Sequence, residues 1–476
     1  MPVRKQYDAV VVGSGPNGLA AAIVLAEAGR SVLVIEGKET VGGGLRSAEL
    51  TLPGFVHDNC ATIHALGLGS PFLRRLPLHE YGLEWVQPGA PLAHPLDDGS
   101  AVLLHQSVEE TAVGLGSDGP AYRRLMEPLV DEWQAIVDQF LGPLRVPRHP
   151  LTMARFGLSA IRSAVGLARG SFKREPTRAL FAGLAAHSIL PLDQLGTAGF
   201  GLVLGLMAHA VGWPLARGGS QAVADALTCH LEALGGEIAT GKWVRSLADV
   251  PASRAILFDV TPRQLVDIAG EDLPATFRRR LKRFRYGPGV FKVDWALDGP
   301  IPWRNEGCLR AGTVHVGGTL TEMAQSEKSV WEGRHPERPY VLLVQASLFD
   351  ETRAPTGGHT VWAYCHVPNG STQDMAGPII QQIERFAPGF RDRIVATHTY
   401  NASEMEAYSP NYVGGDINGG AADLRQLFTR PIVQLNPYTT PNERIYLCSS
   451  STPPGGGVHG MSGYYAAQAA LRRVLT

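Results

Sequence analysis

Three glycines and one carboxylate near the N-terminus have the types and spacing needed to bind a dinucleotide. Gly13, Gly15 and Gly18 form a GxGxxG pattern between an apolar run and an alanine-rich stretch. The first glycine permits a tight turn, the second lets a pyrophosphate approach the backbone, and the third lets a helix pack on a strand. Glu36 follows at the offset where a carboxylate accepts hydrogen bonds from ribose hydroxyls.

These residues need a strand, a turn, a helix and a second strand to position them. Residues 7–36 read YDAVVVGSGPNGLAAAIVLAEAGRSVLVIE and predict those elements in that order. The predicted helix N-terminus offers free amides and positive potential to the phosphates. An ordinary loop with extra glycines would not need the flanking strands, the helix and the acid.

A second glycine-rich loop favours FAD over NAD. Gly42, Gly43, Gly44 and Arg46 follow Glu36, where a nicotinamide dehydrogenase would usually begin its next helix. Such a loop lets backbone amides and an arginine approach a longer ligand. Its composition also fits a plain surface turn.

The C-terminal segment repeats the strand, glycine loop and helix pattern. An apolar strand is predicted at residues 445–448, and an alanine-rich helix is predicted to begin near Gly463. A second helix N-terminus directed at the pyrimidine end of a flavin would stabilise its anionic reduced form.

Taken together, these motifs resemble the phytoene desaturase-like flavoproteins, which include carotenoid desaturases, retinol saturase and pyridine nucleotide-disulfide oxidoreductase domain proteins. The resemblance covers most of the chain. It rests on DAVVVGSGPNGLAAAIVLAEAG and VLVIEGKETVGGG near the start, ARGGSQAVADAL and GGEIATGKWV in the middle, and YLCSSSTPPGGGVHGMSGYYAA at the end.

The resemblance implies an α/β fold with a discontinuous, glutathione reductase-like Rossmann domain for FAD and a second domain for the substrate. Val244 would meet the adenine through its backbone, in a strand-like segment. Many carotenoid desaturases read GGR at the early loop, whereas Gly44 stands at the arginine's place here, which weakens a carotenoid assignment. The predicted cofactor-binding residues are Gly13, Ser14, Gly15, Pro16, Asn17, Gly18, Glu36, Gly37, Gly43, Gly44, Leu45, Arg46, Val244, Gly457, Val458, Met461 and Gly463.

Length and composition fit a globular enzyme of two domains. The chain has 476 residues, a formal net charge of −1 and 44% hydrophobic residues, which gives no reason to expect nucleic-acid binding. Its five cysteines lack CxxC spacing, so neither a metal site nor a disulfide framework is predicted. Without an apolar leader segment, a cytoplasmic location is expected.

We expect three separate stretches to build the FAD-binding domain: residues 1–69, 215–288 and 431–476. Within the second stretch, residues 255–265 are predicted to be a buried strand that ends at Pro262. The substrate domain would comprise residues 70–214, predicted to be mostly helical, and residues 289–430, whose apolar and alternating runs predict a mixed sheet.

Two apolar stretches bear on membrane contact. Arg155, Arg162 and Arg169 recur every seven residues on one predicted helix, a pattern of an interfacial helix and equally of a packed helix with a solvated edge. Residues 196–214 are long and apolar but broken by glycine, so they are predicted to line a substrate tunnel rather than to span a bilayer. The basic run at residues 277–285 is predicted to be a solvated face.

The predicted chemistry is desaturation of a lipophilic, polyene or isoprenoid-like substrate. It requires hydride transfer to the flavin and loss of a proton from the neighbouring carbon, so the protein must mainly hold the scissile carbons flat against the flavin. His459, inside the predicted flavin-facing loop, is the first candidate for a catalytic residue. Tyr364, His366 and Glu404 are weaker candidates, with packing or surface roles as their alternatives.

Several alternatives stay open at this stage. No later GxGxxG precedes a helix, so electrons are expected to pass to a quinone, oxygen or another acceptor rather than to NAD(P). The same pocket would serve a redox-neutral isomerase or a saturase. Amine oxidation and a non-catalytic flavin-binding protein are further alternatives. The substrate and the oligomeric state are not encoded in any motif.

Overall fold

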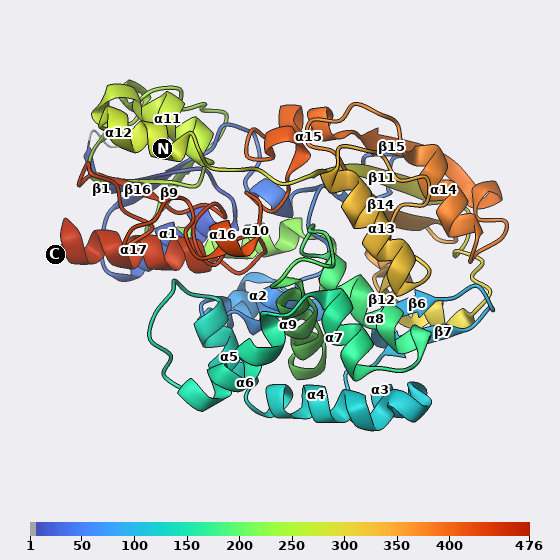
Figure 1. Ribbon diagram of the computed structural model, residues 1–476. Helices are drawn as coiled ribbons and strands as arrows, with labels where there is room; N and C mark the ends of the chain where they lie inside the picture. The colour runs from blue at the N-terminus through green and yellow to red at the C-terminus, as the bar shows by residue number, and fades with distance from the viewer. Residues whose placement is uncertain (1–5) are drawn as a thin grey trace.

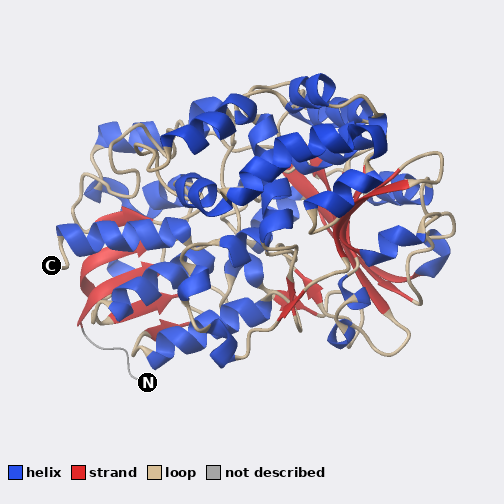
Figure 2. Cartoon of the chain, turned by 90° about the horizontal axis from the view of Figure 1, so that it is seen from below, coloured by secondary structure: helices blue, strands red, loops and turns tan. Residues whose placement is uncertain are grey.

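Two β-sheets at opposite ends of the molecule, joined by a layer of helices, make up the fold. The computed structural model describes residues 6–476. Figure 1 shows the first sheet on the left, the second on the right and the helices of residues 108–210 along the lower side. Figure 2, seen from below, separates the same two sheets.

The first sheet is a five-stranded parallel sheet with the order β16-β10-β1-β2-β9. All three stretches predicted to build the nucleotide-binding domain contribute strands, and this is the Rossmann-like arrangement. Its strands have continuous apolar runs because helices cover both faces of a parallel sheet. They are β1 (Gln6–Val12), β2 (Val32–Ile35), β9 (Glu237–Ala239), β10 (Ala252–Phe258) and β16 (Ile445–Leu447).

Helices α1 (Pro16–Glu27) and α17 (Met461–Arg473) pack directly on each other beside this sheet. The contact depends on Gly463, where an added Cβ would lie only 1.8 Å from the carbonyl oxygen of Asn17. Helix α10 (Gln221–Ala233) packs against α1 as well. The two predicted glycine loops are thereby brought to the same region of the molecule.

The second sheet is mixed and has the order β15-β11-β14-β13-β12-β6-β7. Apart from the parallel pair of β6 with β12, neighbouring strands are antiparallel. One face packs on α14 (Ala376–Glu384), and the other turns toward the interior of the molecule. The strands are β6 (Ala90–Pro95), β7 (Ala101–Leu104), β11 (Gly289–Leu297), β12 (Ala311–Val316), β13 (Val341–Val344), β14 (His359–Val367) and β15 (Ile394–Tyr400).

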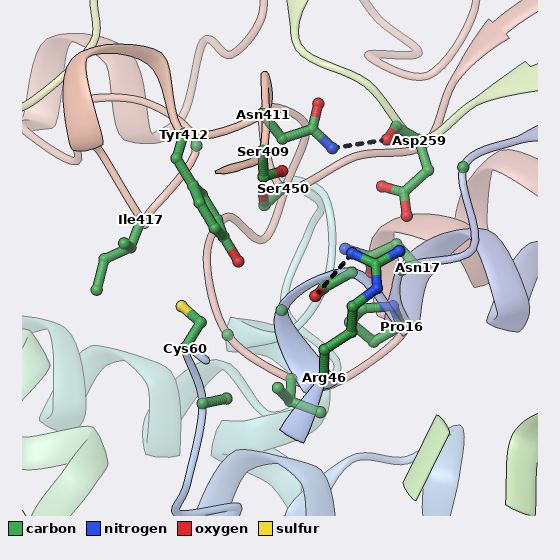
Figure 3. Close-up of a pocket in the computed structure, with 18 of the residues that line it drawn as sticks. Pro16, Asn17, Arg46, Cys60, Asp259, Ser409, Asn411, Tyr412, Ile417 and Ser450 are labelled. Atoms are coloured by element: carbon green, nitrogen blue, oxygen red, sulfur yellow. Dashed lines mark hydrogen bonds between the residues drawn. The ribbon is translucent and has the colours of Figure 1, made fainter. Parts of the chain in front are cut away.

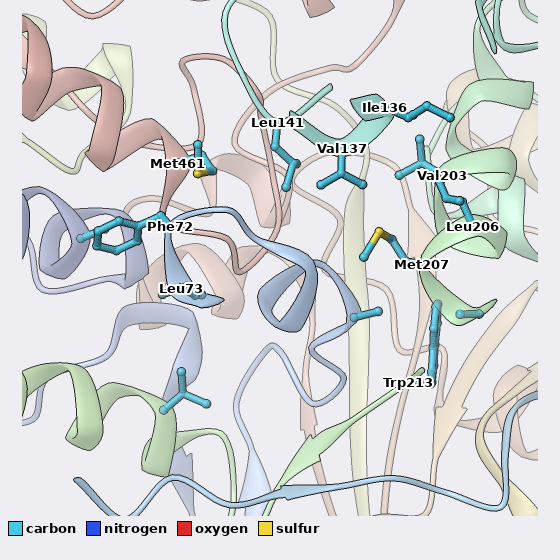
Figure 4. Packing of buried hydrophobic residues seen from close by; sticks show 14 of the residues in the cluster. Phe72, Leu73, Ile136, Val137, Leu141, Val203, Leu206, Met207, Trp213 and Met461 are labelled. Carbon is cyan, nitrogen blue, oxygen red and sulfur yellow. The ribbon is translucent and has the colours of Figure 1, made fainter. Parts of the chain in front are cut away.

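A helical layer supplies much of the largest apolar core. Figure 4 shows Val203, Leu206 and Met207 facing Ile136 and Val137 across the helix contact. The layer consists of α3 (Val108–Gly114), α4 (Gly119–Asp131), α5 (Trp133–Phe140), α6 (Pro150–Ala160), α7 (Ala164–Ser171), α8 (Glu175–Ala186) and α9 (Thr197–Ala210).

The remaining α-helices and strands lie outside the two large sheets and the helical layer. They are α2 (Ala65–Gly69), α11 (Pro262–Ala269), α12 (Ala275–Leu281), α13 (Leu320–Trp331), α15 (Ala402–Tyr408), α16 (Leu424–Leu427), and the two-residue strands β3 (Ser47–Ala48), β4 (His57–Asp58), β5 (Trp85–Val86) and β8 (Leu215–Ala216).

Two expectations about local structure are wrong. Strand β10 ends at Phe258, and Pro262 instead begins α11, where its missing N–H costs nothing. The stretch 70–214 is mostly helical as predicted, and it also contains β6 and β7, joined by a tight turn at residues 96–100. The arginine-bearing helix is broken: Ser163 caps α7 by accepting a hydrogen bond from Gly166, and Arg162 lies between α6 and α7.

Helix α9 contains most of the apolar stretch at residues 196–214 for which a membrane-spanning helix was considered. It has only 14 residues and is largely buried, and within residues 6–476 no helix reaches the length and apolarity that crossing a membrane requires. The basic run forms α12, whose Phe277 and Leu281 are buried while its arginines face outward.

Candidate active site

One cavity runs from the turn after β1 to the inner face of the second sheet. Figure 3 shows Tyr412 and Cys60 on one side of it and Arg46, Pro16 and Asn17 on the other. Of the predicted cofactor-binding residues, those that line it are Gly13, Ser14, Gly15, Pro16, Asn17, Glu36, Gly37, Gly43, Gly44, Arg46, Val244, Gly457 and Val458.

The turn after β1 leaves a helix N-terminus open to an anion. Gly13 has a φ of +102°, which an L side chain rarely adopts. An added Cβ at Gly18 would lie 2.0 Å from the carbonyl oxygen of Gly13, so this position must be glycine. Gly15 is the N-cap of α1 and provides no side-chain cap; Pro16 has no amide hydrogen and the amide of Gly18 is bound by Asp259, so the amide of Asn17 is the one that the first turn leaves to a phosphate.

Glu36 lies at the end of the cavity beside the glycine turns, here called the nucleotide end because the sequence predicts a dinucleotide there. Its carboxylate accepts hydrogen bonds from the amide and hydroxyl of Ser14, at 3.0 and 2.6 Å, and from the amide of Lys38 at 2.9 Å. Arg46 pairs with it at 3.1 Å. These contacts fix the carboxylate at the end of β2, where the sequence places a ribose-binding acid.

Asp259 is a second carboxylate at the same turn, and sequence reasoning missed it. It lies just beyond the end of β10 and accepts a hydrogen bond from the amide of Gly18 at 2.9 Å. Burial, with a smaller contribution from Glu36, raises its pKa to about 7. Figure 3 shows Asn411 donating to the backbone carbonyl of Asp259, at 3.0 Å. A titratable acid therefore sits where the phosphates of a dinucleotide would approach.

The second glycine loop forms a wall of the cavity. An added Cβ at Gly44 would lie 2.7 Å from the hydroxyl of Tyr412, so glycine is required for this close approach. Burial raises the pKa of the Cys60 thiol, which lies beside that hydroxyl and stays protonated. Leu45 differs from its neighbours: its side chain is fully buried in the main core and does not line the cavity.

The part of the cavity predicted to meet the adenine is formed by an irregular segment after β9. Val244 lines the cavity there, but it does not belong to a strand. Gly37 allows the ring of Trp243 to pack on the backbone, since an added Cβ would lie 2.7 Å from that ring.

The C-terminal loop is only partly placed as predicted. Gly457 and Val458 line the cavity, whereas Met461 packs in the core beside Phe72, as Figure 4 shows. Gly463 does not line the cavity, and its missing side chain instead admits the backbone of α1.

His459 is placed outside the cavity, and this corrects its assignment as a catalytic residue. Its ring is fully buried, its Nε2 donates to the carbonyl of Gly455 at 3.2 Å, and its Nδ1 accepts from the amide of Met461 at 3.0 Å. Burial lowers the pKa of His459 to about 4. Both ring nitrogens are used to hold the loop in shape.

The far end of the cavity is apolar with a few polar groups. Leu204, Trp213, Leu342 and Trp362 line it together with Thr313, Tyr364 and His187. Of the weaker candidates, Tyr364 thus lies in the cavity wall. His366 is paired with the buried Glu327 at 2.8 Å, and Glu404 closes a capping box at the start of α15.

His64 is another cavity residue that no motif revealed. Its Nε2 lies 2.8 Å from the hydroxyl of Ser220, which in turn donates to the carbonyl of Ala61 at 2.6 Å. The serine oxygen therefore accepts from His64, which leaves Nδ1 as the unprotonated ring nitrogen, with no partner among the described residues. Burial lowers the pKa of His64 to about 4.

No group of three or more His, Cys, Asp or Glu in residues 6–476 is arranged to hold a metal ion. Ionisable residues along the cavity instead cluster near the glycine turns, and the far end keeps aromatic walls. This division suits a charged, elongated cofactor at one end and an apolar ligand at the other.

Comparisons with known proteins agree with this geometry. Residues 11–76 match the family model of the NAD(P)-binding Rossmann-like domain. The chain is 25% identical to pyridine nucleotide-disulfide oxidoreductase domain-containing protein 2 of Rattus norvegicus, over 99% of this chain and 94% of that protein. It is also 25% identical to phytoene dehydrogenase of Streptomyces griseus, over 81% of this chain and 77% of that protein.

The solved structure of an oxidoreductase from Methanosarcina mazei shares the fold, with a TM-score of 0.67 and 16% identity over 98% of this chain and 99% of that one. These likenesses support an FAD-dependent oxidoreductase of the kind that includes the pyridine nucleotide-disulfide oxidoreductase domain proteins and the phytoene desaturases.

Proposed function

We propose that this protein binds FAD and dehydrogenates a lipophilic, polyene or isoprenoid-like substrate, forming a carbon–carbon double bond. The observation that carries the proposal is the single cavity that joins a phosphate-binding turn to an apolar wall of the second sheet. A relative named phytoene dehydrogenase supports the reaction type.

The residues present fit FAD. The uncapped N-terminus of α1 would take the pyrophosphate, Glu36 would accept from the adenosine ribose, and the backbone at Gly43 and Gly44 would follow the ribityl chain. Gly457 and Val458 would lie against the flavin ring, near the start of α17. When bound, FAD supplies a two-electron acceptor that can take a hydride from carbon.

The chain's own contribution is to hold and desolvate the substrate. Trp213, Trp362 and Leu342 form flat apolar surfaces that would orient the scissile carbons and exclude water. His64 is the candidate to take the proton from the neighbouring carbon, because its Nδ1 carries a lone pair without a partner. A pKa of about 4 makes it a weak base, so it would serve only where an adjacent cation has already acidified that carbon.

The proposal is tested by mixing the purified protein anaerobically with lipid extract from its own source. We expect flavin absorbance near 450 nm to bleach (roughly the usual flavin maximum), with loss of two hydrogens from a lipid detected by mass spectrometry. A protein that neither carries nor binds FAD would refute the proposal at its first step. For reoxidation we propose a quinone or oxygen as acceptor.

A redox-neutral isomerase or a saturase is the alternative for the same cavity, and the same experiment separates them. Isomerisation would give products of unchanged mass while the flavin stays oxidised. A saturase would add two hydrogens only after the flavin has been reduced by an external donor.

A further inference from the structure

A row of polar side chains crosses the inner face of the second sheet at the far end of the cavity. Strand pairing places His315 beside Leu342, Leu342 beside Tyr364, and Tyr364 beside Lys292. Side chains in such a row point to the same face of the sheet. A purely hydrocarbon ligand would need no such row.

His187 connects this row to the cavity. It caps the C-terminus of α8, lines the cavity, and its Nε2 lies 3.0 Å from the Nε2 of His315. Its Nδ1 has no hydrogen bond to any described residue. His315 is held from behind, because its ring packs against Tyr340 and over Gly183, where an added Cβ would lie 2.5 Å from its Nδ1.

Tyr364 offers a second unused group. It lines the cavity, its side chain is nearly buried, and its hydroxyl makes no hydrogen bond to the described residues. Two rings lie against it, that of Trp362 in edge contact at a centroid distance of 5.2 Å and that of His366 at 5.6 Å. A hydroxyl in the cavity wall that has no partner in the protein is free to donate a hydrogen bond to a ligand.

The surroundings of these groups are electrically balanced. Lys292 forms an ion pair with Asp294 on β11, and the Nδ1 of His366 lies 2.8 Å from a carboxylate oxygen of Glu327 on α13. Burial lowers the pKa of His187 to about 3, so its imidazole is neutral. A carboxylate or an ammonium entering here would find no uncompensated opposite charge, and its desolvation would be unfavourable.

We propose that the far end of the cavity binds one uncharged oxygen function of the substrate, an alcohol or a ketone, through His187 and Tyr364. The substrate is then an oxygenated lipophile rather than a pure hydrocarbon. This inference rests on the proposed function for the role of the cavity, but it concerns binding and not turnover.

The test measures ligand binding to the FAD-loaded protein by quenching of the fluorescence of its tryptophans, among them Trp213 and Trp362 in the cavity wall. The probes are 1-octanol, 2-octanone, octane and octanoate. In H187F and Y364F we expect the Kd of octanol and octanone to rise about ten-fold, as for the loss of one hydrogen bond, while that of octane changes less than about two-fold. Y364F removes only a hydroxyl, so it keeps the test valid if H187F does not fold.

The matched control is W213F, which should weaken octanol and octane by similar factors. Equal losses for octanol and octane in Y364F would overturn the inference, as would octanoate binding the wild type most tightly. His187→Gln, whose amide can still donate and accept, should restore part of the preference for octanol. A protein that binds the alcohol and the ketone as described but dehydrogenates nothing would contradict the proposed function and still support this site.

Discussion

The buried carboxylate of Asp259 should make the stability of the cofactor-free protein fall as the pH rises. Its pKa is raised from 3.8 to about 7, mainly by burial. Below pH 3.8 the group is protonated in both the native and the unfolded state and has no effect. Between about pH 4 and 7 the unfolded state releases the proton while the native state keeps it, so the free energy of unfolding falls by about 1.4 kcal/mol per pH unit.

Asp259→Asn removes this titration and keeps an oxygen to accept from the amide of Gly18, which lies 2.9 Å from the carboxylate in the wild type. From pH 5 to pH 8 we expect the stability of D259N relative to the wild type to increase by about 3 kcal/mol, roughly two pH units at 1.4 kcal/mol each. The measurement is urea unfolding of both proteins, freed of cofactor, at several pH values.

The control is Asp8→Asn, near the start of β1, the central strand of the same sheet. The pKa of Asp8 is lowered, chiefly by its hydrogen bond from the amide of Ser31, so above pH 5 Asp8 is ionised in both the native and the unfolded protein. The difference between D8N and the wild type should therefore be flat from pH 5 to pH 8. A flat difference for D259N as well would refute the claim that Asp259 is buried and holds its proton.

Three further variants test other parts of the site. Gly463→Ala should destabilise the protein by about 3 kcal/mol or more in thermal unfolding, because a Cβ there would lie 1.8 Å from a carbonyl oxygen of α1. The control Gly377→Ala, in an open helical position, should be neutral or stabilise by about 0.5–1 kcal/mol in the same measurement. His459→Ala should cost about 1–3 kcal/mol of stability and leave the pH–rate profile unchanged, and a lost limb in that profile would return His459 to the chemistry. Leu151 and Leu158 are 86% and 76% exposed beside exposed arginines, and we propose that they contact anionic lipid. Their joint replacement by Glu should reduce co-sedimentation with phosphatidylserine vesicles about ten-fold, and a wild-type protein that does not co-sediment would refute this contact.

The nucleotide end could be predicted from sequence because its chemistry is local. The turn at Gly13 and the acid at Glu36 belong to one strand-turn-helix-strand unit, and the contact of Ser14 with Glu36 spans only 22 positions. Glycine at these places is required by the backbone itself, which leaves a readable pattern. The same reasoning identified Gly457 and Val458 as cavity residues.

Long-range partners could not be predicted in this way. Asp259 contacts a residue 241 positions away, and His187 meets His315 across 128 positions. A lone acid after a strand and a lone histidine after a helix carry no spacing signal, because only the folded chain brings their partners near. A retrospective hint is the run FDVTP, where an acid interrupts the apolar run that the structure shows to be the end of β10.

The error at His459 has the opposite origin. The residue lies in the right loop, and position in that loop suggested a catalytic role. However, the loop must satisfy its own backbone groups where water is excluded, and the imidazole does so by bonding Gly455 and Met461. In a buried glycine-rich loop, a polar side chain is first available to the loop and only then to a ligand.

The distribution of charge along the cavity explains how one site can serve two unlike molecules. Charged side chains such as Glu36 and Arg46 line the end of the cavity where a dinucleotide would bring its phosphates. At the far end, charges such as Lys292 are cancelled within the wall itself, and the cavity surface is left to neutral rings. A wall that excludes water would keep water from attacking the carbon that loses a hydride, so the neutral end is where a lipophilic substrate would be bound for oxidation.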